Sequence, residues 1–254
     1  MSQTAKVRVD RDDELALLVR LACSETPTRI ALIQAESGMG KSELVREFRE
    51  RCPKDLPLVV VDFKGGGLSL ADVLFHIYDT LGWKRFPTLA QAIQNIVRPT
   101  QINVTGNVLI GQNEISIALG GPDEQTRELH RNQLTTALVT DLRALDRVVL
   151  IVDVFEKCDA VLRAWLTSLL LPAIHRSQHL TIIVAGQQVP ECTQMWECEQ
   201  LLLEPIAPKY WQIYARAVGA AALSLDFIEG CCVALKGHCL SIANTLESQG
   251  GRRV

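Results

Sequence analysis

The residues best suited to chemistry lie in one short stretch, AESGMGKSEL at residues 35–44. Its glycine spacing and its Gly-Lys-Ser sequence are typical of a phosphate-binding loop, in which backbone N–H groups wrap phosphates at the positive end of a helix. Ala35 stands where the usual pattern has glycine, but it precedes the part of the loop that would wrap the phosphates. The residues expected to bind here are Ser37, Gly38, Met39, Gly40, Lys41, Ser42 and Glu43.

Single residues of this loop would have separate roles. Gly38 and Gly40 would allow the backbone to approach the phosphates closely. Lys41 would reach the outer phosphates and assist catalysis there, and the Ser42 hydroxyl would help to hold Mg²⁺. The alternative is an ordinary glycine-containing turn between a strand and a helix, so support has to come from other parts of the chain.

Further polar residues follow two other apolar runs. Asp153 ends the run RVVLIVD and would hold Mg²⁺ with its water shell, and Glu156 would polarise the attacking water as a general base. Gln187 follows the run LTIIVAG and would contact the γ-phosphate or the water as a polar sensor. The alternatives are a helix N-cap for Asp153, a solvated charge for Glu156 and a plain loop residue for Gln187.

The apolar pattern predicts the elements that must position these residues. Residues 28–35 read as a buried strand and residues 40–52 as a helix, which is the strand, loop and helix order that a phosphate-binding loop requires. Strands and helices alternate over most of the chain, which indicates an α/β fold with a five-stranded, mainly parallel sheet between helices. Together with the phosphate-binding loop, this order resembles the fold of a P-loop NTPase. The other predicted strands are at residues 58–63, 147–153, 180–186 and 198–206.

Two segments depart from this alternation. Residues 101–119, QINVTGNVLIGQNEISIAL, alternate between apolar and polar positions, which predicts a β-hairpin insertion that covers the sheet or pairs with a partner strand. Residues after 206 are helical in pattern and predict a small C-terminal lid. We therefore expect a P-loop NTPase core at residues 1–206 and a helical lid subdomain at residues 207–254.

Composition excludes several classes of function. The net charge of −3 gives no electrostatic reason to expect a nucleic-acid partner, and no apolar run predicts a signal peptide or a membrane span, so we expect a cytoplasmic protein. The eight cysteines and five histidines show no metal-ligand spacing. The cysteines are expected to be small buried side chains rather than a disulfide framework.

Together these residues resemble the STAND-type ATPases, signal transduction ATPases with numerous domains, within the AAA-related P-loop NTPases. The resemblance implies ATP and Mg²⁺ as cofactors, with Mg²⁺ near Ser42 and Asp153, and Arg11 and Glu14 beside the nucleotide. It runs from about residue 8 to residue 247. The motifs that carry it are VDRDDELALL, GMGKSEL, VVLIVDVFE, VAGQQVPE, LLLEPIAPKYWQIYARAVG and LKGHCLSIANTL.

The chain departs from the family pattern at two positions of the site. Gln187 stands where arginine is common at the sensor position, and Cys239 stands where many members have the lid proline. The first departure bears on the rate of hydrolysis more than on binding, because an arginine there would help to neutralise the γ-phosphate. The chain also resembles an ATPase core without the sensor repeats of its relatives, which implies a homo-oligomer or a separate effector or sensor protein as partner.

Two classes of function follow. The first is an ATP-hydrolysing regulatory switch whose nucleotide state controls assembly, and the family resemblance suggests a role in signalling or anti-phage defence. An arginine from a neighbouring copy could assist hydrolysis, with Arg143, Arg147 and Arg176 as candidates by location only. The alternative for each, which the sequence favours, is a solvated surface charge. The second class is a nucleotide-binding scaffold with little or no turnover. A small-molecule kinase is disfavoured, because the C-terminal segment resembles a lid rather than an acceptor-binding domain.

Overall fold

The sheet at the centre of the molecule has five strands, all paired in parallel. The computed structural model describes residues 11–97 and 110–250. The strands are β1 (Ile30–Gln34), β2 (Leu58–Asp62), β3 (Val148–Asp153), β4 (Leu180–Gly186) and β5 (Glu199–Leu202). Their order across the sheet is β2-β3-β4-β1-β5. The predicted five-stranded α/β fold is therefore confirmed, with β1 between β4 and β5.

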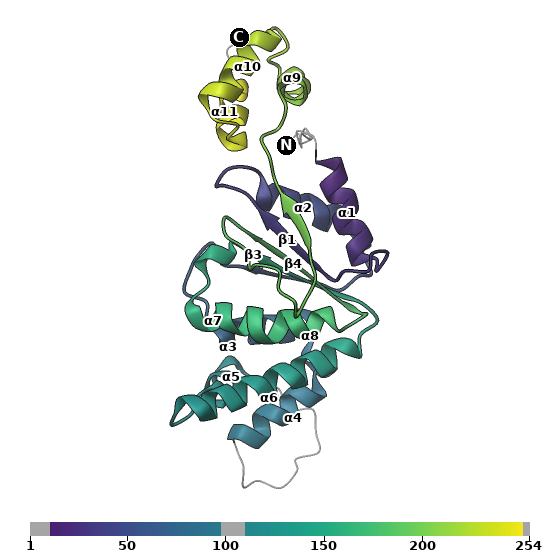
Figure 1. The fold of residues 1–254 in the computed structure, drawn as a ribbon, viewed down its shortest axis with the longest axis vertical. Helices are drawn as coiled ribbons and strands as arrows, with labels where there is room; N and C mark the ends of the chain where they lie inside the picture. Colours follow the sequence, from purple (N-terminus) through teal and green to yellow (C-terminus); the bar gives the residue numbers. More distant parts are fainter. Residues whose placement is uncertain (1–10, 98–109, 251–254) are drawn as a thin grey trace.

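Helices cover both faces of the sheet, as a parallel sheet requires. Along β1, Ala31 and Ile33 join the apolar cluster on one face, while Ile30 and Leu32 join the cluster on the other. The first face packs against α1 (Asp12–Ala22) and α2 (Lys41–Arg51). The second packs against α3 (Leu70–Leu81), α7 (Ala160–Trp165) and α8 (Leu171–His175), with a π-helical turn at Leu166–Leu170 (Figure 1).

A further layer of helices lies beyond this second face (Figure 1). It consists of α4 (Pro87–Val97), α5 (Gln112–Leu119) and α6 (Glu124–Arg143). Short 3-10 helices elsewhere in the chain occupy Trp83–Arg85, after α3, and Phe155–Lys157, after β3. The prediction of a β-hairpin is wrong for residues 112–119, which form α5. It is also wrong for residues 110 and 111, which are in no strand, and residues 101–109 lie outside the described part of the chain.

The helical form of α5 has a clear local cause. The Glu114 carboxylate accepts a hydrogen bond from the backbone N of Gly111 at 3.1 Å, which satisfies one free amide at the helix N-terminus. A strand would place Ile115 and Ile117 on one face, but Ile115 is 0% exposed and Ile117 is 61% exposed. The spacing from Ile115 to Ala118, both buried, fits a helix that packs against its neighbours.

The C-terminal helices form a group of their own, seen at the top of Figure 1. They are α9 (Pro208–Ala217), α10 (Leu225–Ala234) and α11 (Cys239–Gly250). Buried side chains of these helices, among them Trp211, Ile228 and Ile242, make an apolar cluster separate from the two that flank the sheet. The division into residues 1–206 and 207–254 stays a proposal, and this separate cluster supports it.

Two general expectations concern the cysteines and the membrane. The expectation of small buried side chains holds for Cys52, Cys158 and Cys239, and it is wrong for Cys192 and Cys198, which pair with each other between β4 and β5. They lie in one short loop, where the chain itself brings them together. Within residues 11–97 and 110–250, none of the helices is long and apolar enough to cross a membrane.

Candidate nucleotide-binding site

The phosphate-binding loop connects the carboxyl end of β1 to the N-terminus of α2. Gly38 has φ +76° and Gly40 has φ +93°, a left-handed conformation in which a side chain would be strained. Gly40 is the residue immediately before α2. The N–H groups of the first turn of α2 have no acceptor within the helix, so they lie at the loop as free donors. The two glycines are therefore required by backbone conformation, and the loop presents donors suited to phosphate oxygens.

Lys41 is almost completely buried, with 9% of its surface exposed. Its Nζ donates hydrogen bonds to the carbonyl oxygens of Ala35, at 2.6 Å, and Glu36, at 2.9 Å. Burial lowers the pKa of Lys41, and the nearby Glu156 and Asp153 carboxylates act in the opposite direction. The ammonium therefore bridges the start of the loop to its end and stays close to the two acidic residues.

Asp153 and Ser42 meet directly, although they are more than a hundred residues apart in sequence. The Asp153 carboxylate, on a residue with 6% exposure, accepts hydrogen bonds from the Ser42 hydroxyl and from the backbone N of Val154, the latter at 2.9 Å. Burial raises the pKa of Asp153, and the neighbouring Asp62 adds to the shift. Val154 has φ +62°, a strained conformation for a β-branched residue that fixes the turn after β3.

These oxygen atoms fit Mg²⁺ when phosphate is also present. Mg²⁺ is usually held by one or two carboxylates together with water and substrate phosphates. A hydroxyl and a carboxylate in contact at the mouth of the loop provide that donor set. Among residues 11–97 and 110–250, no group of three acidic, histidine or cysteine side chains could bind a metal ion by itself.

Glu156 and Gln187 are also brought together. The Glu156 Oε2 atom accepts a hydrogen bond from the backbone N of Gln187 at 2.9 Å. A side chain at Gly186 would have its Cβ 2.7 Å from this oxygen, so the glycine at the end of β4 leaves space for the carboxylate. Arg163 donates to the backbone oxygen of Glu156 at 2.5 Å and thereby holds the turn that carries it.

Asp62 is a site residue that the sequence reasoning missed. It ends β2 and pairs in register with Asp153, so the two carboxylates lie side by side at the carboxyl edge of the sheet. The available signal was the run LVVVD, an apolar strand followed by aspartate in the same way as RVVLIVD. The strand order needed to place them together was not evident from the sequence.

Arg11 connects the core to the lid. Its guanidinium pairs with Glu14 at 2.9 Å and donates to the backbone oxygen of Glu204 at 2.5 Å, just after β5. It also forms a hydrogen bond with the Cys239 side chain at the start of α11. The lid touches the phosphate loop itself, because the backbone N of Leu240 donates to the Gly38 oxygen at 3.3 Å.

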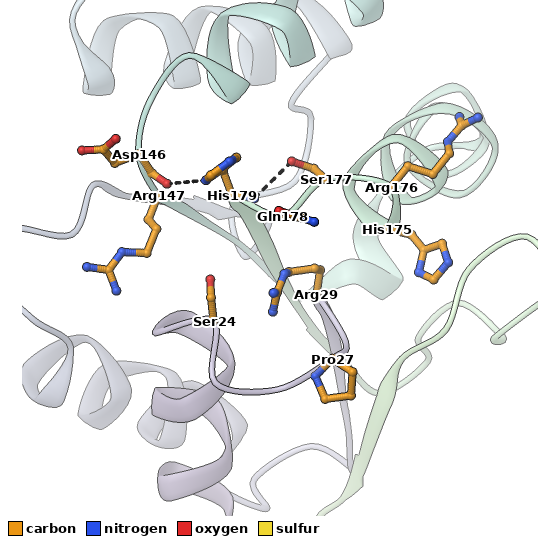
Figure 2. Close-up of a pocket in the computed structure, with 10 residues that line it drawn as sticks. All are labelled: Ser24, Pro27, Arg29, Asp146, Arg147, His175, Arg176, Ser177, Gln178 and His179. Atoms are coloured by element: carbon orange, nitrogen blue, oxygen red, sulfur yellow. Dashed lines mark hydrogen bonds between the residues drawn. The ribbon is translucent and has the colours of Figure 1, made fainter.

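The three candidate arginines lie away from this loop. Arg147 and Arg176 line a cavity of about 620 Å³ at the amino ends of β1, β3 and β4, the edge of the sheet opposite the phosphate loop. Figure 2 shows the Arg176 side chain pointing away from Arg29 and Arg147. Arg143 donates to the backbone oxygen of Ala173 at 3.0 Å. Within one chain, none of the three reaches the loop.

Comparison with known proteins agrees with the architecture. The family model described as the AAA ATPase domain matches residues 9–183, which include the phosphate loop, Asp153 and Glu156. No curated protein matches the chain in sequence. The chain is similar to a solved STAND protein with a tetratricopeptide repeat sensor from Pyrococcus horikoshii, at 14% identity and a TM-score of 0.55, over 95% of this chain and 30% of that one.

Two further solved structures are similar. Cdc6p from Pyrobaculum aerophilum matches at 14% identity and a TM-score of 0.54, over 98% of this chain and 65% of that one. Drosophila ORC bound to DNA matches at 16% identity and a TM-score of 0.44, over 94% and 60%. The chain thus spans less than two thirds of each of these proteins, and the likeness shows the fold alone. The expectation that nucleic acid is no partner stays a prediction.

The family match has more weight, since it covers more than half of the chain. It includes both the loop with Lys41 and Ser42 and the strand end with Asp153, which the structure brings into contact. The chain belongs to the AAA ATPase domain family of P-loop NTPases.

Proposed function

We propose that the protein is an ATP-binding and ATP-hydrolysing switch, in which the bound nucleotide sets the position of the C-terminal lid and thereby assembly with a second copy or a partner protein. The observation that carries this proposal is the direct contact between the lid and the phosphate loop, from the Leu240 N–H to the Gly38 oxygen. A change in that loop on nucleotide binding would alter the lid contact at once.

In this proposal each polar residue of the site has one task. Lys41 exchanges its two loop carbonyl partners for the outer phosphate oxygens, and the loop amides from Ser37 to Glu43 wrap the phosphates. Ser42 and Asp153 hold Mg²⁺, which would neutralise charge on the phosphates. Glu156 accepts the proton of the attacking water, and Gln187 orients that water or the γ-phosphate.

The output depends on the lid and on Arg11. Because Arg11 contacts both Glu204 and Cys239, a change in α1 or in the linker after β5 would shift the lid. The exposed lid side chains Phe227, Val233 and Leu240 offer apolar surface for a second copy or for a separate effector or sensor. A cytoplasmic role in signalling or anti-phage defence forms part of the proposal, through the likeness to a STAND protein.

A nucleotide-binding scaffold is the second candidate. It is favoured by the hydrogen bond that the Gln187 backbone amide donates to Glu156, which occupies one of the two carboxylate oxygens, Oε2. In that case ATP would stabilise the core and the lid without turnover. The two candidates differ in hydrolysis and in whether assembly reverses as ATP is consumed.

The test compares assembly with and without nucleotide. Light scattering after size exclusion would give the mass of the parent, of Lys41→Ala and of the matched surface variant Lys54→Ala, each with and without Mg²⁺-ATP. The switch predicts a change of mass, or of binding to the partner, with ATP in the parent and in Lys54→Ala but not in Lys41→Ala. ATP binding that changes neither mass nor partner binding would reject the switch.

A further inference from the structure

The lid places one histidine directly on the phosphate loop. Resting on the proposed function, we propose that His238 is a phosphate-contacting residue, whose imidazole N–H donates to the diphosphate part of the bound nucleotide. It would thus report to the lid that the loop is filled with phosphate. Neither the predicted site residues nor the family match, which ends at residue 183, includes it.

The distance between His238 and Gly38 is the first observation. A Cβ atom added to Gly38 would lie 1.9 Å from Nε2 of His238, 2.1 Å from Cε1 and 2.5 Å from Cδ2. The face of the ring at Nε2 therefore lies against the loop glycine. The loop at this point is the part that cradles phosphate in such sites, so Nε2 lies at the rim of the phosphate position.

The other ring nitrogen fixes which atom carries the proton. Nδ1 accepts a hydrogen bond from the backbone N of Ser241 at 3.2 Å and lies 2.9 Å from the Ser241 hydroxyl. A backbone N–H can only donate, so Nδ1 is an acceptor and the neutral ring carries its hydrogen on Nε2. Among the described residues, none accepts a hydrogen bond from Nε2. A donor without a partner in this part of the chain thus lies beside the phosphate loop.

The backbone around His238 is held in place. Gly237 has φ +71°, and a Cβ atom there would lie 2.4 Å from Cβ of Pro205 in the linker after β5. Cys239, the first residue of α11, is buried and contacts Arg11. Contacts on both sides therefore fix the position of the imidazole, which makes it suited to sense what fills the loop.

The ligand class follows from the chemistry of this contact. An N–H donor at a loop of backbone amides selects phosphate oxygens and does not distinguish bases or sugars. ATP, ADP and inorganic pyrophosphate should therefore all depend on His238. A contact with the adenine or the ribose would affect ATP and ADP but leave pyrophosphate unchanged.

The experiment measures the affinity of the full chain for each of these three ligands, by calorimetry or by displacement of a fluorescent ATP analogue. The variants are His238→Ala, His238→Gln and His238→Asn, with His179→Ala at the opposite edge of the sheet as control. Gln places an amide N–H near the position of Nε2, whereas Asn places its amide near Nδ1. Thermal unfolding without ligand checks that the lid remains folded in each variant.

We expect His238→Ala and His238→Asn to bind ATP, ADP and pyrophosphate about tenfold more weakly, the loss typical of a hydrogen bond to a charged group. His238→Gln should recover most of that affinity, and His179→Ala should match the parent. In the parent, ATP should also slow hydrogen exchange at the Leu240 amide, and in His238→Ala it should not. If the Ala variant unfolds, the comparison of His238→Gln with His238→Asn gives the test, because only Gln places an amide N–H near the position of Nε2.

Three results would overturn the inference alone. The first is unchanged affinity of His238→Ala for all three ligands, and the second is a loss of affinity for ATP without a loss for pyrophosphate. The third is tighter binding by His238→Ala, which would show that the imidazole blocks the phosphate position. In each case the parent still binds ATP, so the proposed function stands. A parent that binds none of the ligands would overturn the proposed function and this inference with it.

Discussion

The carboxylate of Glu156 accepts a hydrogen bond from the backbone amide of Gln187 at 2.9 Å, which joins the turn after β3 to the end of β4. Both residues were predicted to act in catalysis. The contact uses the backbone of Gln187 and not its side chain, so the position of Glu156 does not depend on which residue stands at 187. The roles of the two side chains can therefore be tested separately.

Replacing Glu156 with Gln removes the proton acceptor and keeps the shape of the side chain. Because the amide oxygen of Gln still accepts from the Gln187 N–H, the turn should stay in place. We expect Mg²⁺-dependent ATP turnover to fall at least ~100-fold, with the Kd for ATP changed by less than about threefold. Phosphate release and ATP titration measure the two quantities, with exposed Glu191→Gln as control. Unchanged turnover would show that Glu156 is not the base.

Replacing Gln187 with Ala tests the sensor role alone. The backbone N–H that holds Glu156 remains, so any loss of turnover must come from the missing amide side chain. We expect turnover to fall about tenfold while ATP binding changes little. Gln188→Ala, at the adjacent exposed position, is the matched control. If the two variants hydrolyse ATP equally fast, the Gln187 side chain has no sensor role.

Asp153→Asn should separate stability from function. The folded-state pKa of Asp153 is raised above its ordinary value of 3.8 by burial and by Asp62, so the ionised carboxylate destabilises the nucleotide-free fold at neutral pH. We expect the free energy of unfolding of the variant to be about 1 kcal/mol higher than that of the parent. We also expect the variant to lose Mg²⁺-dependent ATP binding. Urea unfolding and ATP titration check the two parts.

The pH dependence of that difference has a definite sign. The cost of the charge is fully present above the folded-state pKa and is lost as the pH falls through it, because the carboxyl group takes up a proton. The stability advantage of Asp153→Asn should therefore be largest near neutral pH and shrink toward the ordinary value of 3.8. A constant advantage across this range would contradict the assignment to the charge of Asp153.

The contact between Gly38 and His238 predicts strong coupling in a double-mutant cycle. Gly38→Ala alone carries the cost of a left-handed alanine, about 1–2 kcal/mol, and a clash with the imidazole. In the His238→Ala background only the backbone cost should remain. Urea unfolding of the four proteins without nucleotide should give a coupling energy of about 1 kcal/mol or more. Additive effects would show that the lid does not rest on the loop.

Much of the core could be predicted because its signals are local. The loop from Gly38 to Ser42 and the apolar runs that end at Asp153 and Gly186 each carry their own pattern, and the structure has a loop or a strand at each place. The failure at residues 112–119 was also local. Apolar residues at every second position fit a strand, but packing of Ile115 and Ala118 and the cap by Glu114 favour a helix.

Contacts between distant segments could not be read from the sequence. The pairing of Asp62 with Asp153 depends on β2 lying beside β3, and the contact of His238 with Gly38 depends on how the lid docks. Neither leaves a pattern in its own segment. For the same reason the placement of Arg147 and Arg176 at the edge opposite the phosphate loop came only from the structure.

The most direct test of the account is a calorimetric titration of the parent with Mg²⁺-ATP, beside Lys41→Ala and Lys54→Ala. The account predicts one saturable ATP site in the parent and in Lys54→Ala, and affinity at least about tenfold lower in Lys41→Ala, where the buried ammonium between the loop carbonyls and the acidic residues is lost. No binding by the parent, or equal affinity in Lys41→Ala, would contradict it.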